Sequence, residues 1–141
     1  MLNKSRIVHQ QQGSVLLEGL IAILIFSMGI LAIVGLQAAA IKTVADSQYR
    51  LEASFLANQL IAQLWTDTGD ISNYALPGGS KAANWKTQVE SLLPGAASSS
   101  PTVNITGDAV SGYTVTVQLN WKAAGEANSH KYTTIAYINT N

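Results

Sequence analysis

The chain has 141 residues, enough for one domain, and 48% of them are hydrophobic whereas only 11% are charged. Eight basic and eight acidic residues cancel, and there is no cysteine. This composition excludes a basic nucleic-acid-binding surface and a small domain held by disulfides. Stability must therefore come from packing.

Residues 1–13 are polar and rich in glutamine, and they contain Lys4 and Arg6 but no acidic residue. A segment of this kind is typical of a targeting leader and is left out of fold reasoning. Basic residues before an apolar span keep that end of the chain in the cytoplasm. We therefore expect the C-terminal part of the chain to lie on the other side of a membrane.

Residues 14–66 contain no proline and are predicted to form one helix. Its first part, 14–41, includes a run from Gly19 to Ile41 without any charge, which meets the length of about 20 residues needed to span a bilayer. Its second part, 42–66, is amphipathic. One apolar face there combines Tyr49, Ala53, Leu56, Ala57, Leu60 and Leu64, and a second, roughly opposite, combines Leu51, Phe55 and Trp65.

The first of these faces is expected to pack on the chain's own C-terminal sheet. The second face has two interpretations, which the sequence leaves open. It contacts another subunit, or it is a small set of exposed apolar residues of the kind that most proteins carry.

Residues 67–141 are predicted to form a globular head that begins with a loop over 68–83, where Gly69, Pro77, Gly78 and Gly79 interrupt regular structure. A short helix is expected over 85–93, capped by Asn84. Strands are expected near 103–106, 113–121 and 130–138, the second marked by strict alternation of apolar and polar residues. The predicted fold class is therefore α+β, a long N-terminal helix packed against a small antiparallel sheet.

Glu18 stands at the start of the apolar run, where a carboxylate near hydrocarbon is costly. A cut between Gly13 and Ser14 would create an amine close to the same depth. A carboxylate and an ammonium attract strongly in a medium of low dielectric. We therefore hypothesise that Glu18 pairs with the Ser14 amine of an adjacent subunit and so fixes the register of assembly.

The stretch from Gly13 to Ala22, with its basic leader, Gly before the cut and Glu at the fifth mature position, resembles the class III signal of type IV pilins and pseudopilins. The resemblance implies cleavage after Gly13 by a membrane prepilin peptidase, N-methylation of Ser14 and the type IV pilin fold. It implies partners as well: other pilins, bound through the N-terminal helix, and the inner-membrane assembly platform. It also implies an inner-membrane protein with a periplasmic head that later enters a filament.

The segment from Ser27 to Leu31, followed by Leu36-Gln37 and Ala45-Asp46-Ser47, is similar to minor pilins of the PilV group. Gly35 stands where many major pilins have proline, and the cysteine pair of such pilins is missing. Both departures favour a minor pilin of a Gram-negative type IV pilus, with roles in pilus biogenesis, twitching motility and adhesion. A minor pseudopilin of type II secretion is the alternative.

A conventional signal peptide with its cut near Ala38-Ala39-Ala40 is a weaker interpretation, because the apolar run exceeds the usual 7–15 residues and contains Glu18 at its head. A single-span anchor carrying a periplasmic binding domain explains the run but not Gly13 and Glu18 together. The remaining polar residues indicate no enzyme, metal site or cofactor. His130 is expected on the surface, and Asp67 and Asp70 are expected to cap the helix end or face solvent.

Overall fold

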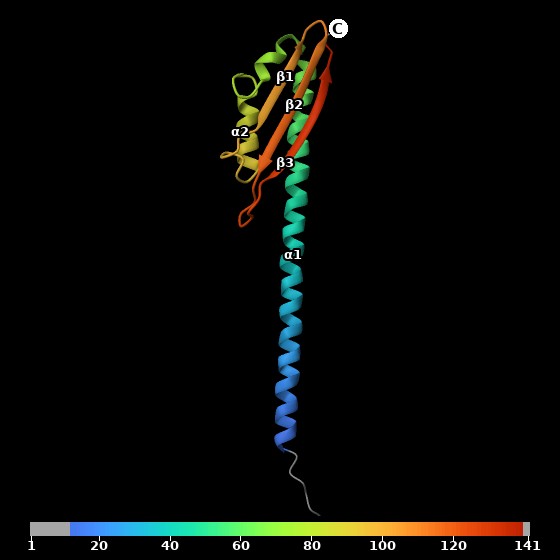
Figure 1. Ribbon diagram of the computed structural model, residues 1–141, viewed down its shortest axis with the longest axis vertical. Coiled ribbons are helices and arrows are strands. Elements are labelled where there is room, and N and C mark those ends of the chain that lie inside the picture. Colours follow the sequence, from blue (N-terminus) through green and yellow to red (C-terminus); the bar gives the residue numbers. More distant parts are fainter. Residues whose placement is uncertain (1–11, 140–141) are drawn as a thin grey trace, which may run out of the picture. The chain divides into compact units, whose positions relative to one another are not determined.

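The computed structural model describes residues 12–139 and has an α+β architecture (Figure 1). Two compact units make up the chain, one ending at Thr43 and one running from Val44 to the C-terminus. The first unit consists of helix in its described part. The second contains the rest of that helix, two shorter helical segments and a three-stranded sheet.

Helix α1 runs from Gln12 to Thr66, so the predicted long helix is confirmed and begins two residues before Ser14. Nothing in this range breaks the backbone hydrogen-bond pattern, because it contains no proline. At the C-terminal end the Thr66 hydroxyl donates to the Gln63 carbonyl at 2.8 Å, and the Asp67 N–H reaches the same carbonyl at 3.1 Å. Both bonds satisfy the Gln63 carbonyl, which lies in the last turn of α1, where carbonyl groups lack backbone N–H partners within the helix.

The loop expected over 68–83 is only partly irregular, because Thr68–Tyr74 forms the 3₁₀ segment η1. Ile71 and Tyr74 of this segment are buried and thus contribute to the core. The backbone then approaches the sheet, where Leu76 forms an isolated antiparallel bridge with Val103. The sequence prediction missed η1 because 3₁₀ turns are short and have no apolar period of their own.

Helix α2 runs from Ala83 to Leu92, and the prediction that Asn84 caps it is wrong. Ala82 occupies the N-cap position and forms no side-chain capping bond, which places Asn84 inside the first turn. The helix starts earlier because Trp85 and Val89 face the core four residues apart, and the turn that carries Trp85 must already be helical. Leu93 is the C-cap and precedes Pro94, where the prediction placed the stop.

The sheet confirms the three predicted strands and extends two of them. Strand β1 (Thr102–Asp108) pairs with β2 (Gly112–Trp121), and β2 pairs with β3 (His130–Ile138), both antiparallel. The β1–β2 turn is held by Asp108, whose Oδ1 accepts the N–H groups of Val110 and Ser111 at 2.8 and 2.7 Å. These bonds, together with the hydroxyl of Ser111, lower the pKa of Asp108.

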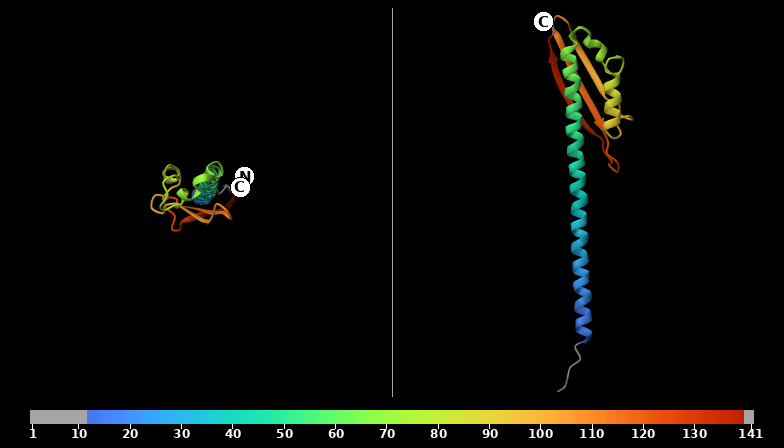
Figure 2. Two further views of the ribbon diagram at one scale, coloured as in Figure 1. Left: turned by 90° about the horizontal axis from the view of Figure 1, so that it is seen from above. Right: turned by 180° about the vertical axis from the view of Figure 1, so that it is seen from behind.

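The core lies between α1, α2 and one face of the sheet, and the end-on view in Figure 2 shows both helices on the same side of the strands. Alternate residues of β2 point into this core, as the period of two predicted. Trp85 is buried and donates its indole N–H to the Leu56 carbonyl of α1 at 2.7 Å. Fully buried residues of α1 are Ala53, Leu56, Ala57, Leu60 and Leu64, and those of β2 are Val115, Val117 and Leu119.

Candidate assembly surfaces

The charge-free part of α1 is apolar on all sides and is exposed among the residues that the structure describes. Between Gly13 and Lys42 every residue is exposed, including Leu16 and Leu31, each at 72%. The helix is long enough and apolar enough to cross a membrane. An exposed apolar surface of this extent requires a cover of lipid or of other protein.

The predicted cleavage bond between Gly13 and Ser14 lies in the first turn of α1. Both residues are exposed, and the space around Gly13 is open. The first N–H groups of any helix lack a carbonyl partner, so its first turn unwinds at a lower cost than its middle. The bond is therefore placed where an extended backbone can be presented to a peptidase.

Glu18 is exposed on α1, four residues after Ser14 and so on the same side of the helix. Within the described part of the chain it has no ion-pair partner. Ser27, in the same stretch, is satisfied internally, because its hydroxyl donates to the Ile23 carbonyl at 2.7 Å. Glu18 differs from Ser27 in carrying a charge that no contact within residues 12–139 neutralises.

The second half of α1 has the two apolar faces that the sequence predicted. The face directed at the sheet is buried, whereas Leu51, Phe55 and Trp65 are 73%, 62% and 51% exposed. These three residues, called here the outer face of α1, lie at spacings of four and ten residues along one side of the helix. They contribute nothing to the core of the head and are available to a partner.

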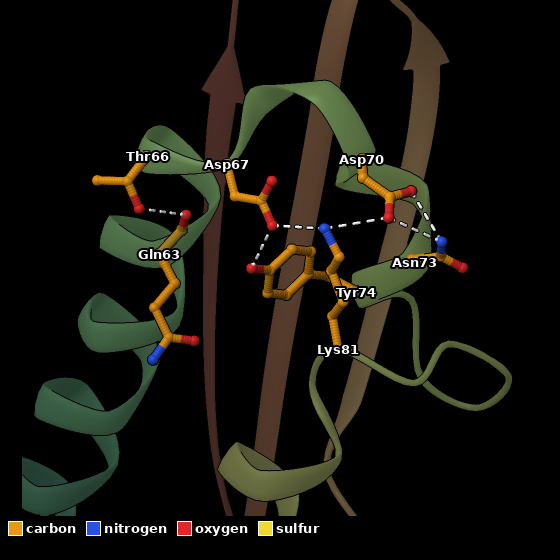
Figure 3. A network of polar contacts seen from close by, with 7 residues as sticks. All are labelled: Gln63, Thr66, Asp67, Asp70, Asn73, Tyr74 and Lys81. Atoms are coloured by element: carbon orange, nitrogen blue, oxygen red, sulfur yellow. Dashed lines mark hydrogen bonds and ion pairs between the residues drawn. The ribbon is translucent and has the colours of Figure 1, made fainter.

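A network of polar side chains lies directly after the C-terminal end of α1 (Figure 3). Lys81 Nζ lies 2.6 Å from Asp67 Oδ2 and 3.0 Å from Asp70 Oδ2. Tyr74 donates its hydroxyl to Asp67 at 2.9 Å, and Asn73 donates to Asp70 at 2.8 Å. Of the two expected roles, capping is not seen for Asp67, which occupies the N-cap position of η1 without a side-chain capping bond, whereas both carboxylates are partly exposed to solvent.

The charges in this network stabilise one another. Hydrogen bonds from Lys81 and Tyr74 lower the pKa of Asp67, and hydrogen bonds from Asn73 and Lys81 lower that of Asp70. Hydrogen bonds to the same two carboxylates raise the pKa of Lys81. The two aspartates therefore hold a cation that belongs to the protein, the ammonium group of Lys81.

His130, which the sequence placed on the surface, is half-buried and makes several side-chain contacts. Its ring stacks on Trp121 with 5.6 Å between ring centroids, and its Nε2 lies 2.6 Å from Glu126 Oε2. Its Nδ1 lies 3.3 Å from Asp46 Oδ1, a buried atom without a hydrogen-bond partner among the described residues, and 3.5 Å from Arg50 Nη2. Asp46 also accepts from Arg50 at 2.9 Å. His130 thus joins α1 to the β2–β3 connection.

Among residues 12–139, no three His, Asp or Glu side chains gather around a possible metal position. The serines of the linker that follows α2 bond locally, Ser98 to the Gly95 carbonyl and Ser100 to Glu90. Sequence reasoning missed Lys81 and Glu126 as partners of the aspartates and of His130. A lone lysine in a glycine-rich loop gives no signal of what it contacts across 14 residues.

Comparison of the chain with protein-family models, with curated proteins and with solved structures gives no match. The functional interpretation therefore depends on the residues of the chain and on their placement.

Proposed function

We propose that the chain is a minor pilin, a structural and assembly-priming subunit of a Gram-negative type IV pilus. The observation that carries the proposal is the start of α1. A glycine and the residue after it lie in the first turn, and Glu18 follows on the same side at the head of an exposed, charge-free helix. The α+β head behind that helix agrees with the type IV pilin fold.

In this proposal the basic leader stays in the cytoplasm, α1 spans the inner membrane from Gly19 to Ile41 and the head lies in the periplasm. Prepilin peptidase cuts between Gly13 and Ser14, which turns an amide nitrogen into an amine that becomes N-methylated. The new ammonium supplies the cation that Glu18 lacks among the described residues.

The pairing partner is the amine of a neighbouring subunit, because subunits must settle at one axial offset to form a regular filament. Gly19 supports close approach of helices here. Without a side chain it leaves a notch between Val15, Leu16, Leu20 and Ile23, and small residues let helices in membranes approach closely. Lipid covers the apolar surface of α1 before assembly, and the helices of neighbouring subunits cover it in the filament.

The test compares Glu18→Gln with Glu52→Gln, a matched change on the same helix outside the charge-free segment. Losing one partner of a desolvated charge pair costs about 2–5 kcal/mol, so incorporation of Glu18→Gln into pili should fall at least about tenfold. Mature protein beginning at Ser14 should still form, as N-terminal sequencing would show, and Glu52→Gln should behave as wild type.

Two results would contradict the proposal. Mature protein that retains Met1 would exclude processing, and full incorporation of Glu18→Gln would exclude the charge pair. Deletion of the gene should abolish or reduce piliation and leave protein secretion intact. Loss of secretion with normal pili would instead identify a pseudopilin.

A further inference from the structure

The two edges of the sheet are treated differently by the fold. The edge formed by β1 is covered at Val103, which exchanges two backbone hydrogen bonds with Leu76, one of 2.9 Å and one of 3.1 Å. The other edge is β3, and among residues 12–139 its backbone bonds run to β2 alone. The free side of β3 therefore presents unpaired N–H and C=O groups to its surroundings.

Proteins usually protect such an edge with a proline, a bulge, inward-pointing charges or a very short strand. Strand β3 has none of these four devices, and the lysine that also protects many edges is present only near its start, as Lys131. It pairs with β2 in continuous register from His130 opposite Trp121 to Ile138 opposite Tyr113, without a bulge and without a proline. Its last seven residues, Tyr132–Ile138, carry no charge and are mostly β-branched or aromatic.

The face of the sheet turned away from the helices also carries few charges and has exposed apolar residues on β3. Ile135 and Tyr137 on β3 are 67% and 58% exposed. The charged residues that β1, β2 and β3 direct to this face are Asp108, at the end of β1, and Lys131, near the start of β3. The uncharged polar residues on this face are Thr102, Asn104, Thr106, Thr114, Thr116, Gln118, Asn120 and Thr133.

We propose that the free edge of β3 pairs antiparallel with β3 of a second copy of this chain, with Ile135 opposite Ile135. In this register Thr133 lies opposite Tyr137 and Tyr132 opposite Ile138, so the uncharged segment pairs wholly with itself. Residues with odd numbers face residues with odd numbers, so outward side chains meet outward ones. The two sheets become one sheet of six strands.

Charge placement favours a second copy as the occupant. Each Lys131 lies beyond the paired segment, opposite Asn139 of the other copy, and the two lysines are about 27 Å apart. That separation exceeds the Debye length of about 8 Å at physiological salt, so the like charges do not oppose pairing. A partner strand with an acidic residue would find no cation within the central register.

The pairing goes beyond the proposed assembly through α1. Strand β3 begins beside Asp46, and Tyr132 lies 3.2 Å from Ser54, so β3 runs along α1 in the direction of that helix. The α1 segments of an antiparallel pair consequently run in opposite directions. The contact therefore joins copies that belong to different assemblies, and its failure would leave the proposed function untouched.

Cysteine cross-linking tests the register, since the chain has no cysteine of its own. The full chain in a mild nonionic detergent is oxidised as Ile135→Cys, Thr133→Cys or Asn104→Cys. Ile135→Cys should form a disulfide dimer, because opposed residues fall within the range that a disulfide bridges. Thr133→Cys should not, because the two copies of residue 133 lie about 13 Å apart.

Asn104→Cys, on the same face but on β1, controls for random collision. Equal cross-linking of all three variants, or none from Ile135→Cys, would overturn the proposal. Ile135→Lys should lower the dimer association constant at least about tenfold in sedimentation, because it sets like charges directly opposite each other. Asn104→Lys should not, and circular dichroism verifies that both variants are folded; an unchanged association constant for Ile135→Lys would refute edge pairing.

Discussion

The outer face of α1 offers a direct test of which side of the helix serves the fold and which serves a partner. Leu60 is fully buried, so Leu60→Ala should lower the free energy of unfolding by about 2–5 kcal/mol. Leu51 is 73% exposed, and Leu51→Ala should change the free energy of unfolding by no more than about 0.5 kcal/mol. The same chemical change on two sides of one helix thus separates two roles.

Truncation of Phe55 should reduce incorporation into pili more than truncation of Leu51, because Phe55 has the larger side chain. It is 62% exposed, so Phe55→Ala should leave the isolated subunit nearly as stable as wild type. If a neighbouring subunit covers the ring, the variant loses about 1.5–3 kcal/mol of burial, which corresponds to a drop in incorporation of about tenfold or more.

Unfolding is measured by urea titration of the full chain in detergent, with the fluorescence of the buried residues Trp85 and Trp121 as the probe. Incorporation is measured as the fraction of subunit recovered in sheared pili. The reasoning fails if Phe55→Ala unfolds as easily as Leu60→Ala, which would make the outer face part of the fold. It also fails if Phe55→Ala assembles as wild type, which would leave the face without a partner.

Two further predictions concern charges in the head. The lowered pKa values of Asp67 and Asp70 mean that their contribution to stability is present above their ordinary pKa of 3.8 and lost as pH falls through the lowered values. The raised pKa of Lys81 means that its contribution is present below its ordinary value of 10.5 and lost as pH rises through the raised one. Lys81→Met should therefore flatten the pH dependence of the melting temperature at both ends, and an unchanged acid limb would refute the ion pairs. His130→Ala should lower the free energy of unfolding by about 0.5–1.5 kcal/mol, because it removes the ring that stacks on Trp121. A double-mutant cycle with Asp46→Ala should show a coupling free energy between the two contacting side chains, and strict additivity would contradict it.

Elements with a clear apolar period were predictable from the sequence. The buried face of α1 and the alternation of β2 follow from spacing alone, because a helix and a strand each present one face at a fixed interval. The register of the sheet and the burial of Trp85 add detail to those predictions without changing them.

Contacts between distant segments were not predictable. Asp67 and Lys81 meet only because η1 folds back beside the end of α1, and His130 meets Asp46 only because β3 lies along that helix. Such pairs have no local signature, since their residues are unremarkable in their own segments. The candidate residues at the start of α1 are a different case. The structure places Gly13, Ser14 and Glu18 on an exposed helix, and their roles remain predictions.

The indole bond between Trp85 and the Leu56 carbonyl has a mechanical consequence. A force along the axis of α1 between residues 44 and 66 would shear the helix past the sheet rather than peel it away. Sliding requires the buried side chains from Ala53 to Leu64 to leave their positions together. The hydrogen bond from the indole N–H to the Leu56 carbonyl must break in the same step, so the head should unfold at one threshold force rather than gradually.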